Sequence, residues 1–295
     1  MVLWDKNMAE IDKSLTATHK SFINHLQASG KAAATILAYG KDVQQLLEFL
    51  TKKQVTQVAS VNTEHIEDFK EYLTDNQYIA KTISRKLNSV KTFFRYLIAE
   101  KLIAKNPAVS VTHPQYEVRP PRVLSKMEYR ALRDAARDDA RIAAIIEILL
   151  QTGMRIGELA RLELNDIVEK EIKIKAFESH PERIVPLNQP TKKALGRYLS
   201  LRPKARSKNV FITKTGRGLL VRNMRSAIVR YFRIAGIEKA TINDLRHTFI
   251  AHQLMAGASV VLIQRLVGHK RLSTTEKYLD LLKGKIEQAV KLEEL

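Results

Sequence analysis

The chain has 295 residues, 45% of them hydrophobic, which is enough to build two domains with separate cores. It carries 50 Lys and Arg residues against 31 Asp and Glu, a formal net charge of +19 with a pI near 10.0. A balance this basic is typical of proteins that bind the phosphates of nucleic acids. The absence of cysteine excludes disulfides, a thiol nucleophile and cysteine-ligated metals, and it fits a reducing compartment.

The hydropathy pattern argues against secretion and against a membrane segment. The N-terminal residues lack the apolar stretch of a signal peptide. The longest apolar run, near residues 142–150, is too short to cross a bilayer and contains Glu147. We therefore expect a cytoplasmic protein that acts on DNA.

The first third of the chain predicts a helical bundle. A leader over residues 1–12 precedes two helical patterns between Ser14 and Leu50, which are separated near Gly30. A third helix is expected to begin with Thr63 as its N-cap. The fourth is the most regular, because its apolar residues recur at alternating spacings of four and three. They are Ile83, Leu87, Val90, Phe94 and Leu97.

The opposite face of this fourth helix is polar and has no acidic residue. It consists of Lys81, Arg85, Asn88, Thr92 and Arg95. A solvated surface is one interpretation of such a face. In a chain this basic, a set of cations, amides and hydroxyls favours contact with DNA phosphates or groove edges.

A proline-rich segment separates the bundle from the rest of the chain. Asn106-Pro107 ends the helical pattern, and HPQYEVRPPR at 113–122 holds three of the eight prolines without periodicity. We therefore predict a helical DNA-binding domain over 13–112, a linker over 113–124 and a second domain over 125–295.

The second domain is predicted to be mainly α-helical with a small antiparallel β-sheet. Alternation of apolar and polar residues indicates two strands around a polar turn, and a short apolar run indicates a third. The expected strands cover 171–176, 183–187 and 210–212. The expected helices cover 126–138, 140–151, 191–201 and 224–234.

The stretch 241–280 predicts three further short helices. Thr241 and Asp244 form a capping-box pair at the start of the first, which places Arg246 in its opening turns. The second helix ends at Gly268, so that His269 follows its negative end, a setting that favours the protonated imidazole.

The third helix of this stretch is expected to carry Tyr278. Ser273 and Glu276 would form its capping box. A guanidinium, an imidazole and a phenol therefore arrive on successive short helices, which is typical of a site for phosphate chemistry.

Four motifs of this half of the chain, in order, resemble the signatures of the tyrosine recombinases, the phage-integrase family that includes the Xer and Cre enzymes. They are T-G-M-R-I-G-E-L, L-R-H-T-F, Q-x-L-V-G-H and T-T-x-x-Y. The resemblance covers the second half specifically and the first half more weakly. It implies a SAM-like core-binding domain and a catalytic domain that together clamp duplex DNA.

The resemblance also implies the chemistry. Arg155 and Arg246 would bind the scissile phosphate, Glu158 would support Arg155, His269 would donate a hydrogen bond and Tyr278 would be the nucleophile. The product is a 3′-phosphotyrosyl link, and strands exchange through a Holliday junction between paired protomers that form a tetramer. From spacing alone, Tyr278 is more typical of a packing residue.

No metal or other cofactor is expected. The eight histidines show no metal-ligand spacing, and Gly216 and Gly218 lack the frame of a P-loop. The resemblance implies that the C-terminal segment docks on a neighbouring protomer, and the alternative is a cap on its own domain. Accessory DNA-binding proteins are possible further partners.

Two positions depart from the family pattern. Asn243 stands where the family has a histidine, and an amide cannot accept the phenol proton. Glu178 aligns with the lysine that protonates the leaving 5′-hydroxyl, so Lys175 is the nearest substitute, with Lys173 as the alternative. Because of these departures, one alternative is a protein of the same fold that binds DNA as a clamp without catalysis. A second alternative is a nicking-closing enzyme like the type IB topoisomerases, which use the same phosphotyrosyl chemistry.

Overall fold

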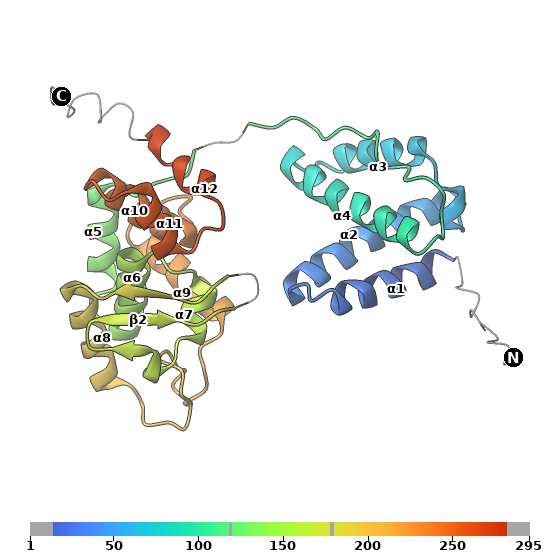
Figure 1. The fold of residues 1–295 in the computed structure, drawn as a ribbon. Helices are drawn as coiled ribbons and strands as arrows, with labels where there is room; N and C mark the ends of the chain where they lie inside the picture. Colours follow the sequence, from blue (N-terminus) through green and yellow to red (C-terminus); the bar gives the residue numbers. More distant parts are fainter. Residues whose placement is uncertain (1–13, 118–119, 178–179, 282–295) are drawn as a thin grey trace, which may run out of the picture. The chain divides into compact units, whose positions relative to one another are not determined.

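The computed structural model describes residues 14–117, 120–177 and 180–281. The chain divides into two compact units, Met1–Val118 and Arg119–Leu295, and the division falls inside the predicted linker (Figure 1). Within the described part of the chain, no helix is both long enough and apolar enough to cross a membrane. The predicted leader and the C-terminal segment from residue 282 lie outside the described residues.

The first unit is a helical bundle, as predicted. Its helices are α1 Leu15–Ala28, α2 Ala33–Lys52, α3 Thr63–Asp75 and α4 Ala80–Ala99, with a 3₁₀ turn at Val58–Ser60. The predicted N-cap of α3 is one residue off. Asn62 caps the helix, because its side chain accepts a hydrogen bond from the His65 backbone N–H at 3.0 Å.

The apolar stripe predicted on α4 is confirmed as the centre of this bundle. All five of its residues are buried, and α4 packs against α1, α2 and α3. On the opposite face, Lys81, Arg85, Asn88 and Arg95 are exposed, while Thr92 is half-buried and its hydroxyl donates to the Asn88 carbonyl at 2.8 Å.

A buried carboxylate joins α2 to α4. Asp42 is only 2% exposed, and its oxygens accept hydrogen bonds from Lys86 Nζ at 3.0 Å and Ser89 Oγ at 2.8 Å. The Arg85 guanidinium makes a two-point contact with the same carboxylate. A buried charge is tolerated only when it is paired in this way.

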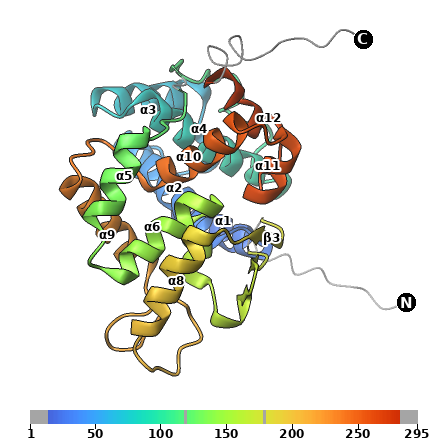
Figure 2. The same cartoon turned by 90° about the vertical axis from the view of Figure 1, so that its left-hand side faces the viewer.

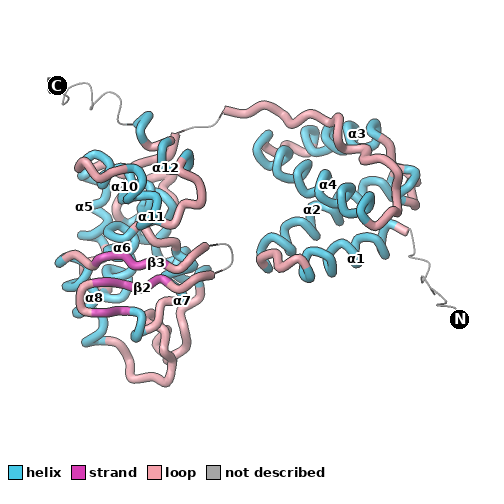
Figure 3. Tube along the Cα trace, viewed as in Figure 1, coloured by secondary structure: helices cyan, strands magenta, loops and turns pink. Residues whose placement is uncertain are grey.

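The second unit is mostly helical with one small antiparallel sheet, as the sequence predicted (Figure 3). The strands β1 Ile167–Val168, β2 Glu171–Ile174 and β3 Arg183–Pro186 pair in that order, with Ile172 opposite Val185. The helices are α5 Lys126–Ala135, α6 Ala140–Thr152, α7 Ile156–Arg161, α8 Gln189–Leu201, α9 Val221–Ile234, α10 Ile242–Met255, α11 Val260–Val267 and α12 Ser273–Glu276.

Helix α6 forms the centre of the second unit. It is apolar on nearly all sides and lies between α8 and α10, against which it packs (Figure 2). The sheet lies along one side of these helices, and β3 packs against α11 (Figure 1). This arrangement brings the end of α6, the edge of the sheet and the C-terminal helices to one place.

The strand predicted at 210–212 is wrong. These residues are buried, but Val210 and Phe211 lie in a bend and Ile212 forms only an isolated bridge, with Gly218. Their backbone bonds are divided between the backbone of Leu162 and Leu219 and the Tyr198 hydroxyl, which donates to the Val210 carbonyl at 3.1 Å and accepts from the Ile212 N–H at 3.2 Å. Apolar content alone cannot distinguish this from a strand.

Other features also differ from the prediction, including the start of α9 at Val221 rather than at residue 224. Helix α5 ends at Ala135 rather than at residue 138, and the two-residue strand β1 was not predicted. Ser273 lies inside α12, whose N-cap is Leu272, so the predicted S-T-T-E capping box is wrong.

The Asp42 network gives a stability prediction for the first unit. Removing its carboxylate by Asp42→Ala leaves Lys86, whose side chain is 9% exposed, without its ion-pair partner. We expect a loss of about 3–5 kcal/mol in the free energy of unfolding, measured by urea denaturation followed by circular dichroism.

Asp68→Ala is the matched control, since Asp68 and Lys53 form an exposed pair at 3.1 Å. Its effect should stay within about 1 kcal/mol. Equal effects of the two substitutions would show that the Asp42 network does not stabilise the bundle.

Candidate active site

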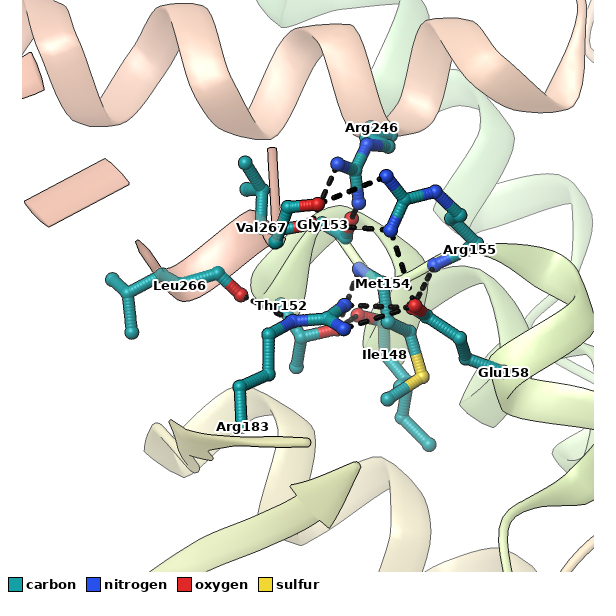
Figure 4. Close-up of polar contacts among 11 residues, drawn as sticks. Ile148, Thr152, Gly153, Met154, Arg155, Glu158, Arg183, Arg246, Leu266 and Val267 are labelled. Atoms are coloured by element: carbon teal, nitrogen blue, oxygen red, sulfur yellow. Dashed lines mark hydrogen bonds and ion pairs between the residues drawn. The ribbon is translucent and has the colours of Figure 1, made fainter. Parts of the chain in front are cut away.

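Three arginines from separate elements gather around the end of α11 (Figure 4). Arg155 is the N-cap of α7, Arg183 begins β3 and Arg246 lies one turn into α10. Arg155 stands just before the helix and not inside it, because its backbone is extended, with ψ at 146°. This capping position points the guanidinium away from α7 and toward α11.

The last carbonyls of α11 hold the guanidinium groups. The Val267 carbonyl accepts from Arg246 Nη2 at 2.7 Å and from Arg155 Nη1 at 3.4 Å. The neighbouring carbonyls of Leu266 and Gly268 accept from Arg183 Nε at 2.8 Å and Arg155 Nη2 at 3.1 Å. Carbonyls at a helix C-terminus lack intrahelical partners and carry partial negative charge, which suits cations.

Glu158 is the carboxylate at the centre of this cluster. Arg183 donates to both of its oxygens, at 2.9 and 2.7 Å, and Arg155 Nη1 donates to Oε1 at 3.1 Å. Burial acts to raise the pKa of Glu158, but the hydrogen bonds and charge of Arg183, followed by those of Arg155, outweigh it and lower the pKa to about 2. Glu158 is therefore ionised throughout the physiological range.

Two glycines permit the close approach of these segments. Gly153 ends α6 with φ at 60°, and an added Cβ would come within 2.4 Å of the Phe249 ring. Its carbonyl accepts a hydrogen bond from Arg246 Nη1. Gly268 has φ at 67°, and an added Cβ would meet Arg183 Nη1 at 3.1 Å. Left-handed backbone and contact with neighbouring side chains both favour glycine here.

The arginines of the cluster differ in their solvent exposure. Arg246 is 8% exposed, and burial, followed by repulsion from Arg155, lowers its pKa to about 9. The Arg155 side chain is 29% exposed, so it offers its remaining N–H groups to a ligand. Three guanidinium groups against the one carboxylate of Glu158 leave an excess of positive charge that suits a phosphate.

His269 is held as a neutral imidazole, contrary to the expectation from its helix end. Burial, followed by the charges of Arg246 and Arg155, lowers its pKa to about 4. Two neighbouring guanidinium groups act more strongly on the ring than the dipole of the short helix α11. Its Nδ1 lies 2.8 Å from Thr275 Oγ1, which leaves Nε2 for another partner.

Tyr278 lies just beyond α12, not on it, and precedes the 3₁₀ turn Leu279–Leu281. The phenol is 5% exposed and packs with a small cluster that includes Phe249 and Ile263. The edge of the His247 ring faces it at a centroid distance of 5.9 Å. Burial raises the pKa of Tyr278 to about 12, although the charge of Arg246 acts in the opposite direction.

Two predicted site residues, Asn243 and Lys175, do not contact the arginine cluster among the described residues. Asn243 is exposed in the first turn of α10, three residues before Arg246. The Lys175 amine pairs with Glu163 at 2.6 Å and Asp166 at 3.0 Å, and among the described residues it makes no ion pair with Glu158. The hydrogen bonds to Glu163 and Asp166 raise its pKa. Glu178 lies outside the described residues.

Arg183 is the residue that reasoning from the sequence missed. Its side chain is only 7% exposed, and it holds Glu158 in place. The signal was present in the alternation of β3, which puts Arg183 on the same buried face as Val185. A cation on the apolar face of a strand requires a buried partner.

The cluster offers hydrogen-bond donors and positive charge without a metal site. Among the described residues, no group of three or more His, Asp or Glu side chains is placed to hold a metal ion. Guanidinium N–H groups beside a neutral imidazole suit the non-bridging oxygens of a phosphodiester and the extra negative charge of its transition state.

The depressed pKa of Glu158 predicts how stability depends on pH. Because the folded pKa, about 2, is below the ordinary value of 4.5, the contribution is complete above pH 4.5 and is lost as pH falls toward 2. The difference corresponds to about 3 kcal/mol. Glu158→Gln should therefore lower the free energy of unfolding at pH 7 and approach wild type only as the pH falls to about 2, measured by urea denaturation at each pH. A deficit that does not change with pH would contradict this account.

Two family models match the chain. Residues 122–285 match the Phage integrase family, and residues 20–101 match the Phage integrase N-terminal SAM-like domain. Tyrosine recombinase XerC of Thermodesulfovibrio yellowstonii is 33% identical over 88% of this chain and 89% of its own length. Tyrosine recombinase XerD of Rickettsia bellii is 30% identical over 87% of this chain and 91% of its own.

Solved structures agree with the fold. XerA recombinase matches with a TM-score of 0.55 at 26% identity, covering 94% of this chain and all of that one. A lambda integrase dimer bound to a core site matches with a TM-score of 0.76 at 17% identity, covering 96% of this chain and 80% of that one. The protein therefore belongs to the phage integrase family of tyrosine recombinases.

Proposed function

We propose that this protein is a site-specific DNA recombinase that cuts and rejoins duplex DNA through a 3′-phosphotyrosyl intermediate. The observation that carries the proposal is the convergence of Arg155 and Arg246 on the Val267 carbonyl, beside His269. The charge of Arg246 also acts on the Tyr278 phenol. Two cations, a hydrogen-bond donor and a nucleophile are the groups that transfer of a phosphoryl group to tyrosine requires.

The two arginines bind the scissile phosphate and stabilise its transition state. Each guanidinium is held by backbone carbonyls, so little reorganisation is needed when charge develops on the non-bridging oxygens. Glu158 positions Arg155, and Arg183 positions Glu158. His269 donates from Nε2 to the same phosphate, with Thr275 fixing the ring through Nδ1.

The phenol has to be activated when DNA binds. In the free protein its pKa is about 12, and it is buried in an apolar cluster. Attack on phosphorus therefore requires Tyr278 to leave this packing and approach Arg246, whose charge stabilises the phenolate. Asn243, exposed on α10, contacts the phosphate but does not take up the proton.

Double-stranded DNA is the partner, and the protein acts as a homo-oligomer. The lambda integrase structures contain a dimer on a core site and a tetramer on a Holliday junction. By analogy, we place two protomers of this chain on one site and four in the synapse. With a net charge of +19 and no cysteine, it is assigned to the cytoplasm, where DNA is available.

The exposed face of α4 contributes phosphate contacts. Arg95→Ala and Lys81→Ala should each weaken DNA binding in gel-shift assays and reduce the slope of log affinity against log salt by about 1. Lys52→Ala, an exposed cation at the end of α2, is the control and should leave the slope unchanged. Equal salt-dependence slopes for all variants would show that α4 is not part of the DNA interface. Arg85 is a poor test, because it also binds Asp42.

Covalent capture of DNA tests the nucleophile. The protein is incubated with DNA fragments that flank its gene or are selected by binding from genomic DNA, including nicked substrates that trap the intermediate. Wild type and Tyr116→Phe should give a protease-sensitive covalent band on denaturing gels, and Tyr278→Phe should give none. Binding without a band in wild type would favour a clamp without catalysis, and covalent nicking without joints between two duplexes would favour a topoisomerase.

A further inference from the structure

One arginine on the exposed face of α4 is held differently from its neighbours. Lys81 and Arg95, near the two ends of this face, make no ion pair with any residue that the structure describes. Arg85 lies between them, and its Nη1 and Nη2 donate to the two oxygens of Asp42, the second bond at 2.9 Å. Its side chain is still 49% exposed, so the anchored guanidinium faces solvent. The three cations of this face are therefore not equivalent.

The contact with Asp42 determines which edge of the Arg85 guanidinium is available to a ligand. A guanidinium has five N–H groups in one plane, arranged as a fork. Asp42 accepts from the end formed by Nη1 and Nη2, while Nε donates no hydrogen bond within the described part of the chain. The Nε–H and the outer Nη2–H point in the same direction from one side of the fork. Arg85 therefore offers two parallel donors.

The carboxylate that holds Arg85 is itself fixed by other groups. Asp42 is 2% exposed and accepts from Lys86 Nζ at 3.0 Å and from Ser89 Oγ at 2.8 Å. Lys86 Nζ also donates to Gln45 Oε1 at 2.7 Å, which keeps the ammonium beside the carboxylate. Because Lys86 already balances the charge of Asp42, the buried carboxylate can act as a rigid support for Arg85.

This support favours a neutral ligand over a phosphate. A carboxylate bonded to the guanidinium repels an anion that approaches the same group, but it does not repel the uncharged edge of a base. Guanine presents two adjacent acceptors, N7 and O6, in the major groove, and an arginine with two parallel donors matches them. The free edge of Arg85 is therefore suited to guanine.

The spacing of the cations on α4 agrees with this assignment. Lys81 and Arg95 are 14 positions apart in the sequence, which corresponds to about 21 Å along a helix. The major groove is about 12 Å wide, so a helix that lies across it has its ends near the phosphates and its middle near the base edges. Arg85, about 6 Å along the axis from Lys81, falls between the two ends.

We propose that Arg85, oriented by Asp42, recognises one guanine of the recombination site in the major groove, while Lys81 and Arg95 bind phosphates of any sequence. The proposal rests on the function proposed above, and it makes Asp42 a positioning residue. Loss of the guanine contact changes which site is chosen, whereas loss of a phosphate contact weakens binding to every sequence alike.

A base analogue tests the contact, since 7-deazaguanine lacks the N7 acceptor of the major groove. The preferred site is selected from a pool of random duplexes with full-length Tyr278→Phe protein, so that binding is separated from cleavage. Each guanine of the site is then replaced in turn by 7-deazaguanine, and affinities are measured by gel shift. One replacement should weaken binding about tenfold. Inosine, which lacks only the minor-groove amine, should have little effect at that position.

Substitutions in the same protein identify the residue that makes the contact. Arg85→Gln should bind the guanine and 7-deazaguanine sites equally, about tenfold more weakly than the parent binds guanine, with an unchanged salt-dependence slope. Asp42→Asn, which keeps an oxygen for Lys86 and Ser89, should reduce the preference at this guanine and at no other position. Circular dichroism checks that both variants are folded.

Arg95→Ala is the matched control on the same face of α4. It should bind every sequence more weakly and keep the full tenfold preference for guanine over 7-deazaguanine. A contact of Arg85 with phosphate would give this same pattern for Arg85→Gln, with a salt-dependence slope reduced by about 1, and that result would overturn the proposal.

Two further results would also overturn it. They are a selected site with no sensitive guanine, and an Arg85→Gln protein that keeps the parent's tenfold preference. If wild type still forms the covalent complex with DNA, these results leave the recombinase function standing. Recognition of guanine by a protein that forms no covalent complex would instead reject the recombinase function and retain the role of Arg85. A pool from which no sequence is enriched would reject both.

Discussion

The carbonyl end of α11 is the feature on which the active site depends. Its last two residues and the following glycine supply three consecutive acceptors, and three arginines from other elements donate to them. Each guanidinium would otherwise repel its neighbours. The partial negative charge of a helix C-terminus and the carboxylate of Glu158 offset part of that repulsion. The remaining positive charge is what a phosphate would neutralise.

Burial and these charges together set the pKa values of the groups around them. Burial, followed by repulsion from neighbouring guanidinium groups, lowers the pKa of His269 and Arg246, whereas Arg183 and Arg155 keep Glu158 ionised and burial raises the pKa of Tyr278. The free protein is therefore arranged to bind an anion but not yet to attack it. In the proposed function, bound DNA would supply the missing negative charge, which would link substrate binding to activation of the site.

The first unit uses a buried charge for a different purpose. Asp42 fixes α2 to α4 through Arg85, Lys86 and Ser89, all from one side of α4. This contact orients the helix whose exposed face is proposed to meet DNA. Arg85 therefore combines two tasks, because its side chain is still 49% exposed while it holds the carboxylate.

Local patterns in the sequence determined much of the fold. The apolar spacing of α4, the alternation of β2 and β3, and the cap at Thr241 are short-range features that depend on neighbouring residues, and the structure has them where they were expected. The motifs that carry the family resemblance also lie within single elements. The predicted site members Arg155, Glu158, Arg246 and His269 could therefore be chosen before any tertiary contact was known.

Only the tertiary structure decided the features that join distant segments. The buried pairing of Arg183 with Glu158 links β3 to α7. The segment at 210–212 shares its backbone bonds between Leu162, Leu219 and the Tyr198 hydroxyl instead of forming a strand. The lowered pKa of His269 also depends on tertiary packing, since it comes from burial, followed by the charges of Arg246 and Arg155. Sequence spacing records which residues are near along the chain, whereas burial and electric field depend on which residues meet in space.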